Sequence, residues 1–265
     1  IILAMGLPAL GFGGIGFPGI SVGTVAAQYS GLLFAVSMLM LRYRKKVFAE
    51  FSLKDARESF TGHEMKRFFN LNADLFIRSL AIMGIYAGIT VISARYGDMM
   101  LAVSSILVQL MMIFSYFTDG FAYAGEALTG KFIGRRDKPA VRQTVRSVFA
   151  WSMGVAAVFM VLYAFFARPM LYVLTSDTEV VTASMEFIPW LIPMPIIGCA
   201  AFTWDGIYVG ATASKPIRNS TLWAVLGFFI VWFAGYFIFR PSPHIAVHIL
   251  MAGFLVHLLI RMLYE

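Results

Sequence analysis

Charged residues are scarce in this sequence of 265 residues. Lys, Arg, Asp and Glu together make up 13% of it, whereas a water-soluble domain carries about 25%. So few charges could not cover the surface of a soluble fold of this size. Hydrophobic residues make up 60%, and the mean hydropathy is +0.79. The composition therefore predicts an integral membrane protein.

Cysteine and the usual catalytic motifs are also nearly absent. Cys199 is the single cysteine, so no intrachain disulfide can form. The sequence has no nucleotide-binding glycine loop, no serine nucleophile elbow and no zinc signature. We therefore expect neither an enzyme nor an ATP-driven pump, and no cofactor. The net charge of +7 is expected in loops at a membrane surface and not on a face that binds nucleic acid.

Three histidines near the end of the sequence were considered as metal ligands. His244 and His248 are four residues apart, a spacing that can hold a metal ion on one helix face, and His257 follows two to three turns later. No acidic or cysteine residue accompanies them in the sequence. We therefore predict no metal site.

Seven apolar segments are long enough to cross a membrane, which takes about 20 residues of helix. They are approximately residues 22–41, 75–94, 101–118, 148–171, 187–208, 222–239 and 245–263. Residues 1–10 resemble the tail of an earlier span, and residues 11–23 form a connection rich in Gly and Pro. Because the chain begins inside an apolar stretch, we expect further sequence upstream. The predicted fold class is all-α, a polytopic membrane helical bundle.

Lys and Arg alternate between the connecting segments. Residues 42–71 contain eight of them, residues 131–146 six and residues 213–219 two, whereas each intervening loop contains one. Cytoplasmic loops carry the excess of Lys and Arg. We therefore predict that the basic segments and the C-terminus are cytoplasmic, in a bacterial-type inner membrane. Within the first segment, Thr61 and Glu64 match a capping box, which predicts the start of a helix.

The few ionisable residues within the spans are functional candidates, because each costs at least about 2.5–3.5 kcal/mol to insert. From the predicted topology, Arg78, Asp119 and Asp205 can share one layer of the bundle, where a surplus carboxylate could bind H⁺ or Na⁺. For Arg78 the alternative is a purely structural ion pair, and Asp74 and Glu126 could instead reach the headgroups. The candidates for ion or substrate binding are Asp205, Asp119, Arg78, Glu126, Asp74 and Asn72.

Prolines and glycines mark possible hinges. Three prolines within seven residues must bend or break the span at 187–208, since each removes a backbone donor and clashes one turn back. Small residues after Asp119 line one helix face and permit either sliding or tight static packing. The hinge candidates are Pro189, Pro193, Pro195, Gly120 and Gly206.

Three motifs resemble the multidrug and toxic compound extrusion (MATE) family. Residues 119–134, DGFAYAGEALTGKFIG, resemble its signature rich in glycine and alanine. Residues 70–78, NLNADLFIR, resemble the start of the seventh helix in the DinF-like branch. Residues 202–211, FTWDGIYVGA, continuing to Arg218-Asn219-Ser220, resemble the tenth helix and the loop after it.

This resemblance implies a fold of two six-helix lobes around a central cavity. Residues 1–41 would be the last one or two helices of the N-terminal lobe, residues 42–71 a basic cytoplasmic linker, and residues 72–265 the C-terminal six-helix lobe. Asp205 matches an acidic residue of the tenth helix that helps to form a cation site. Where some branches have a carboxylate on the seventh helix, this sequence has Arg78.

The function implied by the resemblance is secondary antiport, in which an organic, often cationic, compound leaves as H⁺ or Na⁺ enters. The partners would be membrane lipid, a small organic substrate and the missing N-terminal lobe, which contains the family's proton-coupling acid on the first helix. The alternatives are a flippase for lipid-linked precursors from the same superfamily and a membrane scaffold without transport.

Overall fold

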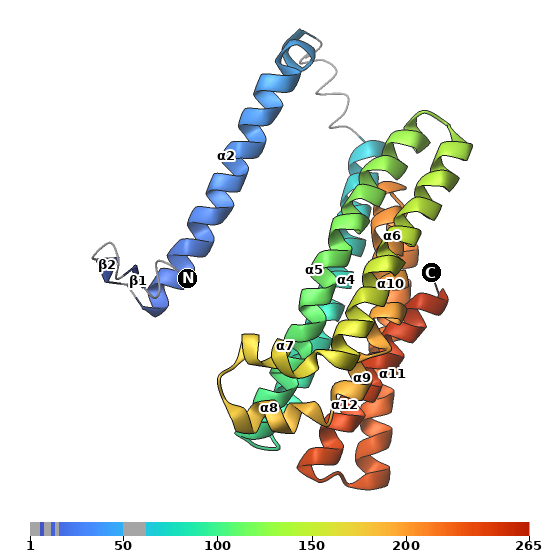
Figure 1. Ribbon diagram of the computed structural model, residues 1–265. Coiled ribbons are helices and arrows are strands. Elements are labelled where there is room, and N and C mark those ends of the chain that lie inside the picture. The colour runs from blue at the N-terminus through green and yellow to red at the C-terminus, as the bar shows by residue number, and fades with distance from the viewer. Residues whose placement is uncertain (1–5, 8–11, 14–15, 50–61, 265) are drawn as a thin grey trace. The chain divides into compact units, whose positions relative to one another are not determined.

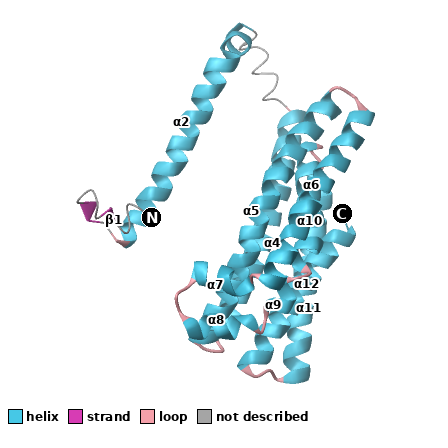
Figure 2. Ribbon diagram, viewed as in Figure 1, coloured by secondary structure: helices cyan, strands magenta, loops and turns pink. Residues whose placement is uncertain are grey.

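The computed structural model describes residues 6–7, 12–13, 16–49 and 62–264. The chain divides into two compact units, Ile1–Lys66 and Arg67–Glu265. Figure 1 shows the labelled elements, and Figure 2 shows that helices dominate. This agrees with the predicted all-α class, apart from two very short strands in the first unit.

The first unit contains one long helix. Strand β1 (Gly6–Leu7) pairs antiparallel with β2 (Phe12–Gly13), and α2 follows over Phe17–Ala49. Residues 6 and 7 were predicted to end an earlier span, and this prediction is wrong for them because they form a strand; residues 1–5 and 8–10 lie outside the described part. Most residues along α2 are exposed, including Tyr29 and Leu33, as expected for a helix made to contact lipid or another lobe.

The second unit is a helical bundle that starts with α4. Its helices are α4 (His63–Ala94), α5 (Asp98–Gly134), α6 (Lys138–Phe165), α7 (Ala167–Leu174), α8 (Thr178–Met185), α9 (Ile188–Leu191), α10 (Met194–Gly210), α11 (Ser214–Phe239) and α12 (Pro243–Tyr264). The α5–α6 turn lies at one end of the bundle, and the α11–α12 turn lies at the other (Figure 1).

Seven helical segments among the described residues are long and apolar enough to cross a membrane, and they match the seven predicted spans. Several differ from the predicted bounds: α4, α6 and α11 begin at His63, Lys138 and Ser214, well before the predicted residues 75, 148 and 222. Helix α5 continues from the predicted end near Thr118 to Gly134, and α6 ends at Phe165 before the short α7 begins. Helices α2 and α4 extend into residues 42–71 from both sides. Thr61 of the predicted capping box lies outside the described residues, but α4 does begin at His63.

The three prolines break the fifth predicted span as expected. Pro189 lies in the first turn of the four-residue helix α9, Pro193 is the N-cap of α10, and Pro195 lies in the first turn of α10. A proline is tolerated at a helix start because the N–H that it lacks would have no partner there. The span is therefore two helices, and each proline occupies a boundary.

Helices α5 and α10 contact each other over a long stretch, and small residues permit a close approach. A Cβ added to Gly206 would lie 2.1 Å from the carbonyl oxygen of Ala122, and one added to Gly210 would lie 2.3 Å from that of Glu126. We call these four residues the α5–α10 seam. Only glycine allows this backbone-to-backbone approach. Gly206 is thus a packing residue in this structure, whereas Gly120 has no atom within 4 Å of an added Cβ.

Candidate ion and substrate site

Asp205 on α10 is the centre of a buried charge cluster. Its Oδ2 accepts hydrogen bonds from Arg78 Nη2 of α4 and, at 2.5 Å, from Arg261 Nη2 of α12. The side chain of Arg261 is 2% exposed and that of Asp205 is 14% exposed. An unpaired charge inside a membrane bundle is costly, so one carboxylate compensates two guanidinium groups drawn from two other helices.

The second carboxylate oxygen of Asp205 has a different environment. Oδ1 is buried and accepts no hydrogen bond from the residues that the structure describes. An ionised carboxylate has room for about four hydrogen bonds, and buried polar atoms are normally paired. Oδ1 is therefore an oxygen ligand that the protein itself leaves available.

Asp119 on α5 lies next to this pair. It is half-buried, and it interacts electrostatically with Asp205 and with Arg78. Among the described residues it forms no ion pair within 4.0 Å. The predicted layer of Arg78, Asp119 and Asp205 is thus assembled in space, and together with Arg261 we call it the Asp205 cluster.

The predicted surplus of negative charge in this layer is wrong. Sequence analysis counted one arginine against two carboxylates, but Arg261 adds a second guanidinium. Arg261 was missed because it lies two residues before the predicted end of the last span, where a long side chain is expected to reach the membrane surface. Instead it turns inward, near the C-terminal end of α12, where the helix dipole favours a positive charge, and it lies over the ring of Phe202 at 5.8 Å.

Asp74 belongs to a separate ion pair, one helical turn before Arg78 on α4. Its Oδ1 accepts from Arg218 Nη1 at 2.5 Å, and its Oδ2 accepts from the Ser214 hydroxyl at 2.7 Å. Asp74 is 6% exposed, so it does not reach the headgroups. Both carboxylate oxygens are satisfied, which makes this pair a structural link between α4 and the start of α11. No local pattern in the sequence marks Ser214 or Arg218 as its partners.

The remaining two candidates are not part of the cluster. The amide of exposed Asn72 donates to the carbonyl of Phe68 at 2.8 Å within its own helix. Glu126 is half-buried, and its backbone forms part of the α5–α10 seam. Neither observation assigns a role to the side chain.

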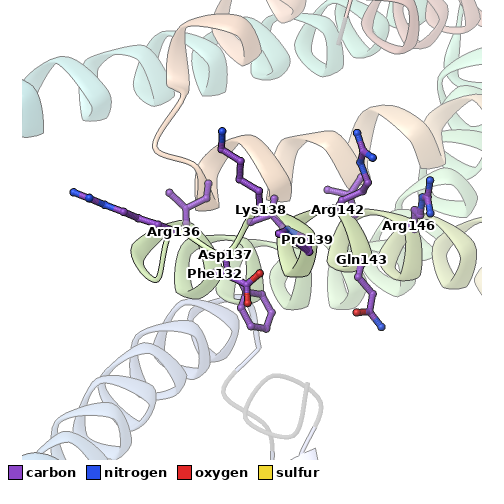
Figure 3. Close-up of a pocket in the computed structure, with 11 residues that line it drawn as sticks. Phe132, Arg136, Asp137, Lys138, Pro139, Arg142, Gln143 and Arg146 are labelled. Atoms are coloured by element: carbon purple, nitrogen blue, oxygen red, sulfur yellow. The ribbon is translucent and has the colours of Figure 1, made fainter.

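A surface hollow of about 1200 Å³ lies away from this cluster, along the α5–α6 turn. Figure 3 shows Lys138, Arg142 and Arg146 on one side of α6 and Gln143 on the other. The cations follow the i, i+4, i+8 spacing of one helix face and are exposed. A cationic row at the end of a span matches the composition of loops that face anionic headgroups.

His244 and His248 lie at the opposite end of the bundle, beside the α11–α12 turn, whereas His257 is buried near the other end of α12. We predicted no metal site because no acidic residue accompanies the histidines in the sequence. The structure does place an acidic residue beside His244 and His248. Glu186, which follows α8, places its Oε2 at 2.6 Å from His244 Nε2. The sequence separates these residues by 58 positions, so only the fold brings them together.

Span-length helices around a buried cluster of opposite charges define a polytopic membrane protein with an internal polar site. The comparisons with known proteins agree with this class. The MatE family model matches residues 75–233, more than half of the chain and the part that contains most of the cluster. This protein therefore belongs to the MatE family of membrane transporters.

Two relatives are similar over most of the chain. The DNA damage-inducible protein F of Escherichia coli (strain K12) is 31% identical over 210 residues, which cover 79% of this chain and 45% of that protein. The probable multidrug resistance protein NorM of Photorhabdus laumondii subsp. laumondii is 23% identical over 232 residues, which cover 85% of this chain and 49% of that protein. The chain spans about half the length of both relatives. No solved structure matches it.

Proposed function

We propose that this chain is part of a secondary antiporter that exports small organic, often cationic, compounds in exchange for H⁺ or Na⁺. The family match and the seven span-length helices support membrane transport. The name of the Photorhabdus relative refers to multidrug resistance, which supports a broad organic substrate class. The Asp205 cluster would supply the ion coupling.

The observation that carries the proposal is the available oxygen of Asp205. Oδ2 is occupied by two arginines, whereas Oδ1 is buried and accepts no hydrogen bond from the described residues. A proton or a sodium ion is the kind of ligand that such an oxygen binds. Asp119 interacts electrostatically with Asp205, and because two neighbouring carboxylates repel each other, a cation bound at Asp205 would relieve that repulsion.

Binding of a cation at Asp205 and Asp119 would weaken the attraction of Asp205 for Arg78. Arg78 lies on α4, which the ion pairs link to the rest of the bundle. In the proposed cycle the ion therefore changes how α4 is held, and a second lobe provides the surface against which this lobe rocks. That lobe is the partner that the chain requires.

The decisive experiment measures ethidium efflux by the complete protein in membrane vesicles. Asp119→Asn is expected to fold normally, because Asp119 forms no ion pair with any residue that the structure describes, and to abolish ion-driven efflux. Asp205→Glu keeps a charge for both arginines but moves the oxygens, so we expect a folded protein with slowed efflux. Glu179→Gln, an exposed acid on α8, is the matched control. Normal coupled efflux by Asp119→Asn and Asp205→Glu would remove the cluster from the mechanism.

The coupling ion follows from the same vesicles. An imposed proton gradient or an imposed sodium gradient is applied separately, and efflux should respond to one of them. If neither gradient drives efflux and all charge-neutralising variants behave as the parent protein does, the membrane scaffold is the better description.

A flippase for lipid-linked precursors is the second candidate. Arg78 and Arg261 give the cluster two cations, which a pyrophosphate group would need. However, Asp205 pairs with both, the two carboxylates of the cluster balance its two guanidinium groups, and the Arg261 side chain is 2% exposed, so little positive charge is left for a pyrophosphate group. Antiport of organic compounds is therefore favoured, and ethidium efflux with no transfer of lipid-linked precursor between leaflets is the expected result.

The proposed orientation places the basic α5–α6 turn and the C-terminus in the cytoplasm of a bacterial-type cell. Because Cys199 is the single cysteine, a Cys199→Ala background allows labelling of one introduced site at a time. In intact cells, Asp177→Cys should react with an impermeant maleimide and Lys138→Cys should not. Reaction at Lys138→Cys and none at Asp177→Cys would show that the orientation in the membrane is opposite to the proposed one.

A further inference from the structure

We propose that Glu186, His244 and His248 form a binding site for a divalent transition-metal ion, with Zn²⁺ as the expected class. Each residue offers one ligand atom, and these atoms all lie within 4.8 Å of one another. The site is at the end of the bundle opposite to the α5–α6 turn, so it is separate from the Asp205 cluster and does not depend on the proposed antiport.

The ligand types fit this class of metal. Two imidazoles and one carboxylate suit zinc and its neighbours, whereas calcium and magnesium prefer oxygen ligands alone. Three protein ligands of this kind leave a fourth position open for water or another small molecule. No further His, Cys, Asp or Glu from the described residues joins the group, so we expect that open position.

The helix geometry already brings the two histidines together. His244 and His248 are four residues apart in the first two turns of α12, so they lie on the same helix face. Their ring centroids are 4.8 Å apart. Phe187 contacts both rings, with centroids at 5.0 and 4.7 Å, which limits how far either imidazole can turn. Little conformational freedom remains to be lost when a metal binds.

The carboxylate comes from another part of the chain. Glu186 ends the α8 segment, directly before Phe187, and its Oε2 is 2.6 Å from His244 Nε2. The side chain of Glu186 is 60% exposed and that of His244 is 42% exposed, so an ion can enter from outside the bundle. A metal ion at this position would cross-link the α8–α9 connection to α12.

The state of His248 is set by a neighbouring tryptophan. Trp190 Nε1 donates a hydrogen bond to His248 Nδ1 at 2.9 Å, which assigns the lone pair of that imidazole to Nδ1. Neutral imidazole is the form that binds metals. A metal ion that takes this lone pair must displace the indole N–H, so binding should change the fluorescence of Trp190.

The test uses Co²⁺ as a visible stand-in for Zn²⁺, with the complete protein in detergent and without any polyhistidine tag. We expect d–d absorption bands of a low-symmetry Co²⁺ site, saturating at one ion per chain and abolished by added Zn²⁺. His248→Gln and Glu186→Gln should each weaken Co²⁺ binding by at least about tenfold. Glu179→Gln, an exposed acid on α8 that is not part of the group, should bind Co²⁺ as the parent protein does.

Folding is checked for every variant by size-exclusion elution and thermal unfolding. Because the side chain of Glu186 is 60% exposed, Glu186→Gln should leave both properties unchanged in the absence of metal. Absence of Co²⁺ bands in the folded parent protein would overturn the proposal. The proposal would also be overturned if folded Glu186→Gln and His248→Gln bound Co²⁺ with the same affinity as the parent protein. Glu186 and His244 would then form an ion pair only.

Discussion

The two sides of α10 are held by opposite means. On the α5 side, the α5–α10 seam brings backbone against backbone, with no side chain at Gly206 or Gly210 to separate the helices. On the α4 side, α4 approaches the rest of the bundle less closely, and charged side chains span the gap at Asp205 and at Asp74. Close contact between small residues fixes a single geometry, whereas an ion pair between long side chains can open when a cation competes for the carboxylate.

This difference suggests which helix moves. Dispersion and backbone contact in the α5–α10 seam are lost over fractions of an ångström, so α5 and α10 should behave as one rigid body. Helix α4 depends on charges that a proton or a sodium ion could screen. The predictions below test whether the two sides differ in this way.

The largest effect is expected at the centre of the charged side. Asp205→Asn leaves Arg78 and Arg261 without their carboxylate, and breaking a buried ion pair costs about 3–5 kcal/mol. The apparent free energy of unfolding in detergent, measured by denaturant titration, should fall by that amount. Replacing all three with apolar residues, as in Arg78→Met, Asp205→Leu and Arg261→Met together, should recover much of the loss, because the two buried guanidinium groups are removed together with their carboxylate.

If Asp205→Asn unfolds at the same denaturant concentration as the parent protein, the charges are not what holds α4. The apolar triple variant then serves as the check, since it should also be unaffected in that case.

The next effect tests the α5–α10 seam with a single methyl group. Gly206→Ala would place its Cβ 2.1 Å from the Ala122 carbonyl oxygen, so the backbones must separate, at a cost of about 1–3 kcal/mol. Gly120→Ala on α5 meets no atom within 4 Å and should gain up to about 1 kcal/mol from helix propensity. Measured by thermal unfolding in detergent, the Tm should be lower than that of the parent protein for Gly206→Ala only. Equal Tm values for both would show that the close contact does not exist.

A double-mutant cycle sharpens the comparison within the Asp205 cluster. Arg78→Met combined with Asp205→Asn should show a coupling energy of about 0.5–3 kcal/mol, the range for residues in contact. Arg78→Met combined with Asp119→Asn should be additive within about 0.5 kcal/mol, since Asp119 forms no ion pair among the described residues. Strong coupling to Asp119 and none to Asp205 would reverse our assignment of the two carboxylates.

The smallest effect is expected at the second ion pair. Ser214→Ala removes one hydrogen bond to Asp74 and leaves the Arg218 contact in place. The loss should be about 0.5–1.5 kcal/mol in the free energy of unfolding, with ethidium efflux by the complete protein unchanged. A loss of efflux without a loss of stability would mean that Asp74 takes part in transport.

Much of the fold could be predicted because the membrane simplifies it. A long apolar segment has no alternative to a helix in lipid, so the seven spans, including the broken one at Pro189, Pro193 and Pro195, follow from local sequence. The apolar span predicted for α5 ended at Thr118, but the helix face of small residues after Asp119 already indicated a continuing helix, and α5 runs to Gly134. The glycines between Gly120 and Gly134 disfavour a helix locally, and contact with α10 at Gly206 and Gly210 keeps that part helical.

Part of the site could be predicted because a charged residue within a membrane span is costly. The free energy of placing a charge in lipid identified Arg78, Asp119 and Asp205. Helix rise and the predicted topology then placed them in one layer of the bundle. Arg261 was missed because its position near a helix end is equally compatible with the membrane surface. Arg218 and Ser214 were missed because nothing local marks them as partners of a residue about 140 positions earlier.

The sequence by itself determined the solvent, the helices and the residues whose charge needs compensation, because hydropathy and the cost of an unpaired charge act at each position alone. The tertiary structure alone decided which charges meet, that two arginines share Oδ2 of Asp205 while Oδ1 accepts no hydrogen bond from the described residues, and that Glu186 meets His244 and His248. Those outcomes depend on helix packing, and packing brings together residues that no local pattern relates.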